Sequence, residues 1–421
     1  MLGDIMDILR AVRQNTAALI ELRRHFHRHP ELSGKEYGTL AYIRARLAKY
    51  GIEHSEIENG GILGYIGSGP EDNTLLLRAD IDALPITENP RNLCRAREVI
   101  SENPGVQHAC GHDAHMAILL TAAKILKEHE YELANGRIIL LFERGEEGGG
   151  NIRHILQHLL ENKVKIAAAH ALHVWAGIET GKVQILSGPT MAGGFGYQVT
   201  LRGKGGHGSR PDGANHPLDA FVAIYNALHT VRMKHISPFD PLTFAIGQLA
   251  SGNRGNIIPG ELTFTGTARF FDITVGEKFK AEFVALLKNI TAAYHVDYQL
   301  APIFICLPTV NNADAAAFAR AAAGSILGAD ALITGEPQMA SESYALIARL
   351  WPAVMAHVGI RNEAVGSGAD HHDEFFDIDE AALPVCVAET LAFAFEFVRT
   401  APKFAHPPGD ISAYLPPMPL G

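Results

Sequence analysis

Short apolar runs alternate with helical patterns in the first part of the chain. Continuous apolar stretches at residues 74–77, 138–142 and 166–173 are typical of buried strands. Between them, residues 115–126 and 152–160 carry apolar side chains at helical spacing. Strands and helices in alternation predict a layered α/β domain with a mostly parallel sheet.

The pattern changes near residue 188. Three segments then alternate apolar and polar positions, as strands with one exposed face do, around a helical segment at residues 217–232. The strand-like segments are 198–201, 243–249 and 262–271. This change predicts a smaller α+β domain, residues 188–302, inserted into the first domain.

Alanine-rich helical patterns resume after residue 303. They cover residues 313–326 and 381–398 and have the character of the first part of the chain. We therefore expect the α/β domain to be built from two separate segments, residues 1–187 and 303–421.

Composition and charge narrow the range of functions. The 421 residues carry a net charge of -10 without a cluster of Lys or Arg, so we expect no nucleic-acid partner. The four scattered cysteines match no zinc-ribbon or disulfide spacing, which indicates a reduced, cytoplasmic setting. No apolar run is long enough to cross a bilayer, so we expect no membrane partner.

Chemically active side chains gather where the predicted strands end. Two carboxylates follow the first strand, two follow the second, and a histidine closes the third. In order, these residues are Asp80, Asp82, Glu146, Glu147 and His173. Ligands of open α/β sheets bind beyond the carboxyl ends of the strands, so these groups are expected to share a crevice.

Two further motifs complete a candidate metal site. HACGHDAH (108–115) precedes a predicted helix, and GADHHDEFF (368–376) precedes the last long helix. A catalytic site needs imidazole, carboxylate or thiolate ligands and a position left for water. The candidate ligands are Cys110, His112, Glu147, His173 and His372. Such a mixed set suits Zn, Mn, Co or Ni.

The adjacent glutamates can divide the work. Neighbouring residues of an irregular loop can point in different directions, so Glu147 can bind metal while Glu146 takes a proton from water. Each cluster by itself is equally typical of a turn, a solvated face or a hydrogen-bonded core. The pattern alone leaves both interpretations open.

The motifs RADIDALPI, HACGHDAHMA, EEGGG, LHVWAGIETG, GKGGHGSRPDGANHP and GNIIPGELTFTGTAR occur in this order. With them the chain resembles the aminoacylase/carboxypeptidase metallohydrolase family, in particular its amidohydrolase branch, from residue 27 to residue 383. The resemblance implies a metal-bearing α/β catalytic domain with a ferredoxin-like lid. It also implies a homodimer, or a higher homo-oligomer, formed through the lid, and a small-molecule substrate.

The resemblance also implies roles for individual residues. The five candidate ligands match the family's ligands for one or two ions per subunit, with Cys110 bridging two ions. Glu146 matches the general base, and Asp82 matches an aspartate that supports a ligand. Three lid residues match groups that hold the substrate or its oxyanion, and the histidine among them is offered to the neighbouring subunit. These are His207, Asn256 and Arg269.

The chain departs from the family where substrate walls are expected. The usual Phe-Gln-Pro-Ala before the glutamate pair is here Phe142-Glu143-Arg144-Gly145, and the usual Glu-Asp-Phe is Glu342-Ser343-Tyr344. Arg144 has two interpretations. It forms a salt bridge with nearby Glu143 or another surface acid, or its planar fork binds a substrate carboxylate.

Three functions therefore stay open at this point. The first is hydrolysis of the amide of an N-acyl amino acid or a related aromatic amide. The second is hydrolytic deamination of an aromatic amine such as a nitroanthranilate, which releases ammonia. The third is a catalytically silent binding protein, which is disfavoured because Glu146 and all five candidate ligands are present.

Overall fold

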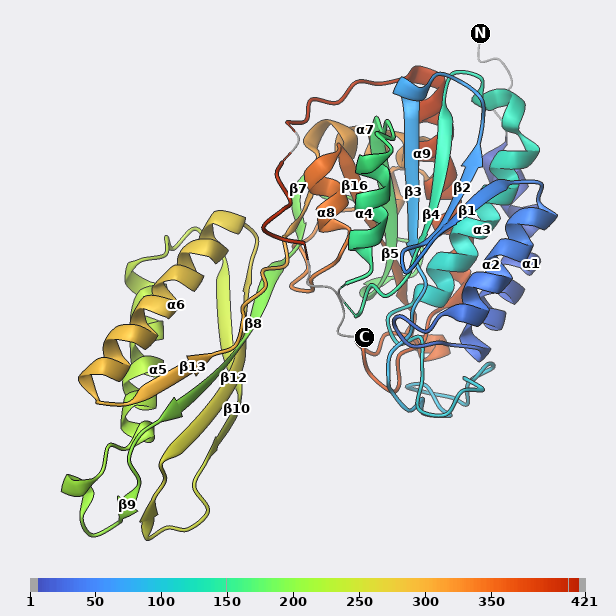
Figure 1. Cartoon of the computed structure of the whole chain (residues 1–421). Coiled ribbons are helices and arrows are strands. Elements are labelled where there is room, and N and C mark those ends of the chain that lie inside the picture. Colours follow the sequence, from blue (N-terminus) through green and yellow to red (C-terminus); the bar gives the residue numbers. More distant parts are fainter. Residues whose placement is uncertain (1–6, 149, 408, 416–421) are drawn as a thin grey trace. The chain divides into compact units, whose positions relative to one another are not determined.

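The computed structural model in Figure 1 describes residues 7–148, 150–407 and 409–415. Contacts divide the chain into two compact units. Unit 1 contains the described residues of Met1–Gly188, Val310–Glu336 and Leu346–Gly421, and unit 2 contains Pro189–Thr309 and Pro337–Ala345. The predicted insertion covered residues 188–302, so unit 2 extends further along the chain than predicted and includes a second segment. Residues 1–6 and 416–421, which belong to the predicted first domain, lie outside the described residues.

Unit 1 is built on an eight-stranded mixed sheet. In spatial order the strands are β1 (Glu53–Ile57), β2 (Gly61–Ile66), β4 (Arg137–Glu143), β3 (Thr74–Asp80), β5 (Ala168–Glu179), β16 (Ala353–Arg361), β6 (Val183–Gln184) and β15 (Leu332–Ile333). The predicted parallel character holds for β4, β3, β5 and β16, whereas β2 runs antiparallel to β4 and β6 runs antiparallel to β16. The sequence pattern did not predict β16, which completes this parallel centre.

Helices cover both faces of this sheet (Figure 1). They are α1 (Ile8–Arg28), α2 (Tyr37–Lys49), α3 (His112–Glu128), α4 (Ile152–Glu161), α7 (Ala313–Leu327), α8 (Ala345–Leu350) and α9 (Leu383–Thr400). Leu75 and Leu77 of β3 belong to the apolar core that contains α3 and α9, whereas Leu76 is fully buried outside that core. Because successive side chains of a strand point to opposite faces, the apolar run of β3 fills both layers.

The segment Glu380–Thr400, which contains α9, is long and apolar enough to span a membrane. Within the protein, 78% of this window is buried, as expected for the central helix of a layered domain. Its apolar character is therefore explained by packing in the core of unit 1.

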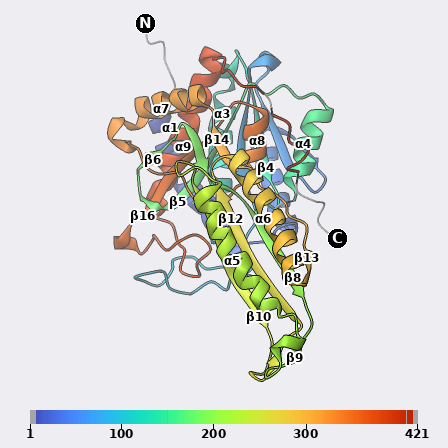
Figure 2. The same ribbon diagram turned by 90° about the vertical axis from the view of Figure 1, so that its left-hand side faces the viewer.

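Unit 2 holds a four-stranded antiparallel sheet in the order β10 (Leu242–Ser251), β12 (Glu261–Phe270), β8 (Gly193–Arg202) and β13 (Asp297–Leu300). The helices α5 (Pro217–Lys234) and α6 (Ile273–Ala293) lie side by side on one face (Figures 1 and 2). The chain order is β8-α5-β10-β12-α6-β13, which is the predicted ferredoxin-like arrangement. A short ribbon of β9 (Gly206–His207) and β11 (Ile257–Ile258) extends from it, and β7 (Gly188–Met191) and β14 (Thr309–Asn311) lie where the chain passes between the units.

A buried network of charges joins α1 to the start of α3 and to Glu88. His27 of α1 bridges two carboxylates, with Nδ1 2.8 Å from Asp113 Oδ2 and Nε2 2.8 Å from Glu88 Oε1. Arg23 Nε donates to the same Asp113 oxygen at 2.9 Å. Burial disfavours ionisation of Asp113, but the charge of Arg23 and the hydrogen bond from His27 outweigh it and hold its pKa well below the usual value.

We predict that Asp113→Asn lowers the free energy of unfolding by roughly 3–5 kcal/mol, because Arg23 then remains buried without its full countercharge. Urea unfolding with a chelator present measures the effect. The pKa of Asp113 is depressed in the folded state, so its contribution is present above about pH 4 and is lost as the pH falls further. The two proteins should therefore converge in acid. Glu396→Gln, which removes an exposed ion pair with Arg399, is the control and should leave the midpoint unchanged.

Candidate metal centre

The carboxyl ends of β3, β4 and β5 place the candidate groups at one edge of the sheet. Asp80 is the last residue of β3, and Glu143 is the last residue of β4. The chain after β4 turns into the loop that carries Glu146 and Glu147. His173 lies within β5, which continues past the end of its neighbour β3. Parallel strands thus bring together residues that are 27 to 93 positions apart, as inferred from the sequence.

His112 is the first residue of α3 and is held by Asp82. Its Nδ1 lies 3.1 Å from Asp82 Oδ1, and the other Asp82 oxygen accepts from the Glu147 backbone N–H at 3.0 Å and from the Ser33 hydroxyl. Gly111, which begins the helix, has a φ of 89°, and a Cβ there would lie 2.3 Å from a methyl group of Val174. With Nδ1 engaged by a carboxylate, His112 is left with Nε2 as its metal-binding atom.

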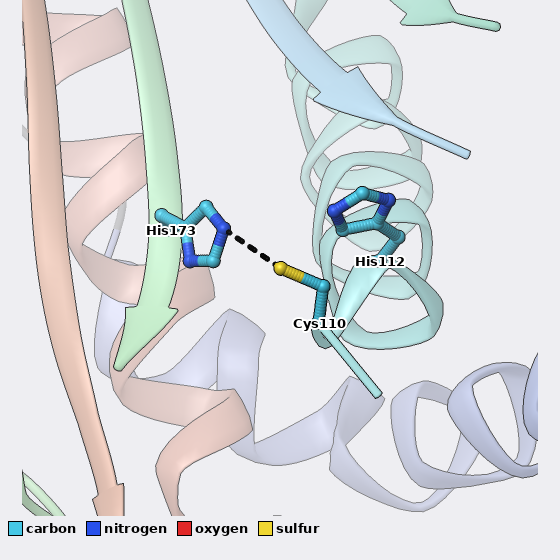
Figure 3. Close-up of side chains that lie close together, drawn as sticks. All are labelled: Cys110, His112 and His173. Atoms are coloured by element: carbon cyan, nitrogen blue, oxygen red, sulfur yellow. Dashed lines mark hydrogen bonds between the residues drawn. The ribbon is translucent and has the colours of Figure 1, made fainter. Parts of the chain in front are cut away.

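His173 is oriented in the same sense by a different partner. Its Nδ1 lies 2.6 Å from the carbonyl oxygen of Val174, which can only accept, so Nδ1 carries the proton. The lone pair is therefore on Nε2, which lies 3.7 Å from Cys110 Sγ (Figure 3). The imidazole and the thiol face each other from β5 and from the residues that precede α3.

Three clusters of donor atoms share members, and within each cluster all the atoms lie within 4.8 Å of one another. The clusters are Cys110–His112–His173, Cys110–Glu147–His372 and His112–Glu146–Glu147. All five predicted ligands and Glu146 are therefore gathered at one place in unit 1. Because Cys110 belongs to two of the clusters, one thiolate can serve two ions.

Two donor atoms at this place have no hydrogen-bond partner among the described residues. They are His112 Nε2 and Glu147 Oε1, both buried. Glu147 Oε1 lies 3.1 Å from His372 Nε2 and 3.9 Å from His112 Nε2, without hydrogen-bonding geometry in either case. Buried polar atoms normally have partners, and an ion between these atoms would supply one. The donor set therefore fits a divalent metal.

The loop before the glutamates is fixed by Arg144, whose guanidinium pairs with Glu36. Arg144 Nε donates to Glu36 Oε2 at 2.9 Å, and Nη2 donates to the Gly34 carbonyl at 2.7 Å. The other Glu36 oxygen accepts from the backbone N–H of Gly145, whose φ of 63° suits glycine. Both side chains are buried. These contacts favour the ion-pair interpretation of Arg144, with Glu36 as its partner in place of Glu143.

His372 approaches the cluster from a segment with unusual backbone geometry. Its φ is 65°, a left-handed conformation uncommon outside glycine, and its N–H donates to the Ala109 carbonyl at 2.9 Å. Such conformations cost energy and are found disproportionately at functional sites. The hydrogen bond ties the His372 backbone directly to the residue before Cys110.

The metal-free protein holds these ligands in forms that a metal must change. Burial raises the pKa of the Cys110 thiol well above its usual value, so the thiol is protonated. Burial disfavours the charged form of His112, but Asp80 and Asp82 outweigh it and raise its pKa well above the usual value. Metal binding therefore releases protons, and affinity rises with pH.

Asp80 and His115 also lie within 4.8 Å of His112, but their own atoms are committed. Asp80 accepts from Arg78 at 2.8 Å and faces His115 Nδ1 at 2.6 Å, and His115 Nε2 accepts from the Val174 N–H at 3.0 Å. They support the site rather than offer ligands. The sequence analysis did not single out His115, although it follows His112 by three residues and so shares its helix face.

The three predicted lid residues all belong to unit 2. His207 lies in β9, opposite Ile257 of β11, and Asn256 is the residue before Ile257. Arg269 lies near the other end of β12, and its guanidinium passes over Gly194. The eight steps along β12 from Glu261, at the ribbon end of the sheet, to Arg269 span about 26 Å at ~3.3 Å per residue. His207 and Asn256 are therefore together, and Arg269 is not with them.

A protein-family model described as Peptidase family M20/M25/M40 matches residues 76–395. The chain is 32% identical over 379 residues to the IAA-amino acid hydrolase ILR1-like 4 of Arabidopsis thaliana, covering 87% of this chain and 82% of the relative. It is also 32% identical over 371 residues to the N-acetyl-L-cysteine deacetylase of Bacillus subtilis (strain 168), covering 87% and 84%.

Solved structures share the fold. The Bacillus subtilis YXEP protein, described as a dinuclear metal binding peptidase, superposes with a TM-score of 0.76 at 26% identity. The superposition covers 92% of this chain and 99% of that one.

We predict that Cys110→Ala and Glu147→Gln lose bound metal, because each removes a charged donor from a shared cluster. Glu146→Gln should retain the metal content of the unaltered protein. Elemental analysis after dialysis against trace metal gives the stoichiometries. Metal loss in the Glu146 variant together with full occupancy in the Glu147 variant would mean that the two glutamates exchange roles.

Proposed function

The chain belongs to peptidase family M20/M25/M40, and from this premise we propose that it hydrolyses the amide bond of an N-acyl amino acid or a related aromatic amide. Its relatives are hydrolases of carbon–nitrogen bonds, and this chain is a metal-dependent hydrolase of the same kind. The observation that carries the finer proposal is the convergence of thiol, imidazole and carboxylate donors, with the carboxylate of Glu146 beside them.

The proposed centre binds one or two divalent ions per subunit. The proposed ligands are Cys110, His112, Glu147, His173 and His372. Support for two ions comes from the position of Cys110 in two donor clusters and from the dinuclear centre named for the YXEP protein. The donor mixture favours Mn, Zn, Co or Ni over Mg or Ca, which prefer oxygen ligands alone.

Glu146 is proposed as the general base and Asp82 as the residue that orients His112. A divalent metal in the centre supplies Lewis-acid polarisation of a carbonyl oxygen and lowers the pKa of water toward ~7. Glu146 accepts a proton from the attacking water and returns it to the leaving amine. Asp82 holds His112 Nδ1 and the Glu147 backbone at once, so a single carboxylate aligns two ligands.

The substrate class is supported by the names of the relatives. They include an IAA-amino acid hydrolase, an N-acetyl-L-cysteine deacetylase and an N-acyl-L-amino acid amidohydrolase. All of these substrates carry an amide nitrogen bonded to an amino-acid carbon, with a free carboxylate nearby. We propose that this chain acts on the same arrangement.

We expect the metal-loaded enzyme to release a carboxylic acid and an amino acid from a panel of N-acyl amino acids. A strong chelator should abolish the activity, and a divalent transition metal should restore it. Glu146→Gln, the matched blank, should lose roughly 10²–10⁴-fold in rate. Aminobenzoates and nitroanthranilates belong in the same panel. Ammonia and a phenol from these compounds, with every N-acyl amino acid left intact, would replace amide hydrolysis with hydrolytic deamination.

We also propose a homodimer whose sites use residues of both subunits. His207 and Asn256 belong to the ribbon that adjoins the Glu261 end of β12, and Arg269 lies about 26 Å along β12 from Glu261, by the ~3.3 Å rise of a strand. Groups that far apart on one rigid sheet do not meet at one small substrate within a single chain. A second subunit that supplies His207 and Asn256 satisfies both positions.

The surface of unit 2 supports this arrangement. Exposed side chains form a stripe along one side of α5, at i, i+4, i+7, i+11 and i+15. They are Leu218, Val222, Tyr225, His229 and Met233. The stripe lies next to β10, because the ring centroids of His229 and of Phe244 in β10 are 4.9 Å apart. β10 is an edge strand of the sheet. An apolar stripe beside an edge strand suits a second copy of the same surface.

Mixing two inactive variants tests the shared site. We expect Glu146→Gln and His207→Ala to be inactive separately and to regenerate part of the activity once their subunits exchange. Each mixed dimer then contains one site with both native residues. Labelled subunits followed by native mass spectrometry verify the exchange. Exchange without any recovery would show that each site is built from one chain.

A further inference from the structure

His115 and Asp80 form a buried pair behind the proposed ligands, without a role in the chemistry described above. Their exposed fractions are 3% and 0%. His115 projects from α3 one turn after His112, and Asp80 closes β3. The pair therefore joins the helix that begins at the metal centre to the central strand of the sheet.

The hydrogen bonds of His115 fix the position of its proton. Its Nε2 lies 3.0 Å from the backbone N–H of Val174, which can only donate, so Nε2 carries the lone pair. The proton is then on Nδ1, which donates to Asp80 Oδ1 at 2.6 Å. The second Asp80 oxygen accepts from Arg78 Nη1 at 2.8 Å, so both ends of the carboxylate are held.

Val174 connects this pair to the metal centre. Its N–H is held by His115, and its carbonyl oxygen accepts from His173 Nδ1 at 2.6 Å. The two groups flank the same Cα, so a displacement of the Val174 backbone would disturb both bonds. The direction in which His173 presents Nε2 toward Cys110 therefore depends on the imidazole of His115.

We infer that His115, held by Asp80, is a positioning residue that fixes Val174 so that His173 presents Nε2 to the metal. The inference rests on the proposed metal centre and is independent of the substrate. Groups that hold a ligand in this way typically contribute roughly 10- to 100-fold to metal affinity.

The test measures the Zn²⁺ dissociation constant of the full-length protein by competition with a chromophoric chelator. His115→Leu should raise this constant roughly 10- to 100-fold. His115→Gln should keep most of the affinity, since its amide oxygen can accept from Val174 N–H while its NH₂ group donates to Asp80. If the Leu variant does not fold, His115→Asn replaces it, because the shorter amide cannot reach both partners.

His170→Leu is the matched control. His170 lies on β5, is 1% exposed and has Nε2 3.0 Å from Oε1 of the buried Glu389, but within the described part of the chain it makes no hydrogen bond to Val174. It should lower the melting temperature to a similar degree and leave Zn²⁺ affinity unchanged. Equal losses of affinity in both Leu variants, or no difference between His115→Gln and His115→Leu, would reduce His115 to a structural role. If the unaltered enzyme turned over no substrate of the panel but the Zn²⁺ affinities changed as expected, the proposed function would be overturned and the role of His115 would stand.

Discussion

Hydrogen bonds to the Nδ1 atoms of two imidazoles decide what the centre of unit 1 can bind. Asp82 occupies this atom in His112, and the Val174 carbonyl occupies it in His173. In both rings Nε2 is left as the atom that can bind a metal, close to the thiol and carboxylates contributed by other segments. Without these two bonds either ring could rotate or exchange tautomers, and the donor atoms would no longer point toward one metal position.

The partners of these bonds must themselves be held, and the fold does so by burying charge in pairs. Asp80 lies between Arg78 and His115, Arg144 is bound by Glu36, and Asp113 is bound by Arg23 and His27. A buried charge without a partner is costly, so each pair restricts the segments that carry it to one arrangement. The loop of Glu146 and Glu147 and the start of α3 owe their fixed geometry to such pairs.

The sequence predicts the strand ends of this centre well because the signal is local. Apolar runs mark β3, β4 and β5, and the polar residues that follow them have to meet at one edge of a parallel sheet. Contacts between distant segments give no such signal. Arg144 meets Glu36, 108 positions earlier, and no periodicity indicates this pairing. The strand β16 and the return of residues 337–345 to unit 2 were missed for the same reason.

The resemblance to a metallohydrolase family, inferred from the sequence motifs, is confirmed by the match to peptidase family M20/M25/M40 over residues 76–395. The tautomers of His112, His115 and His173 lay beyond any motif. They follow from whether the facing group is an N–H, a carbonyl or a carboxylate, and only the packed chain decides that.

The sheet of unit 2 limits how this chain can change by insertion and deletion. Strand β12 separates the ribbon that holds His207 from Arg269, and its side chains alternate between the helix-covered face and the open face. One residue added to or removed from β12 would turn every side chain beyond it to the wrong face. A change that keeps this alternation without a bulge therefore alters that separation two residues at a time, in increments of about 6.6 Å.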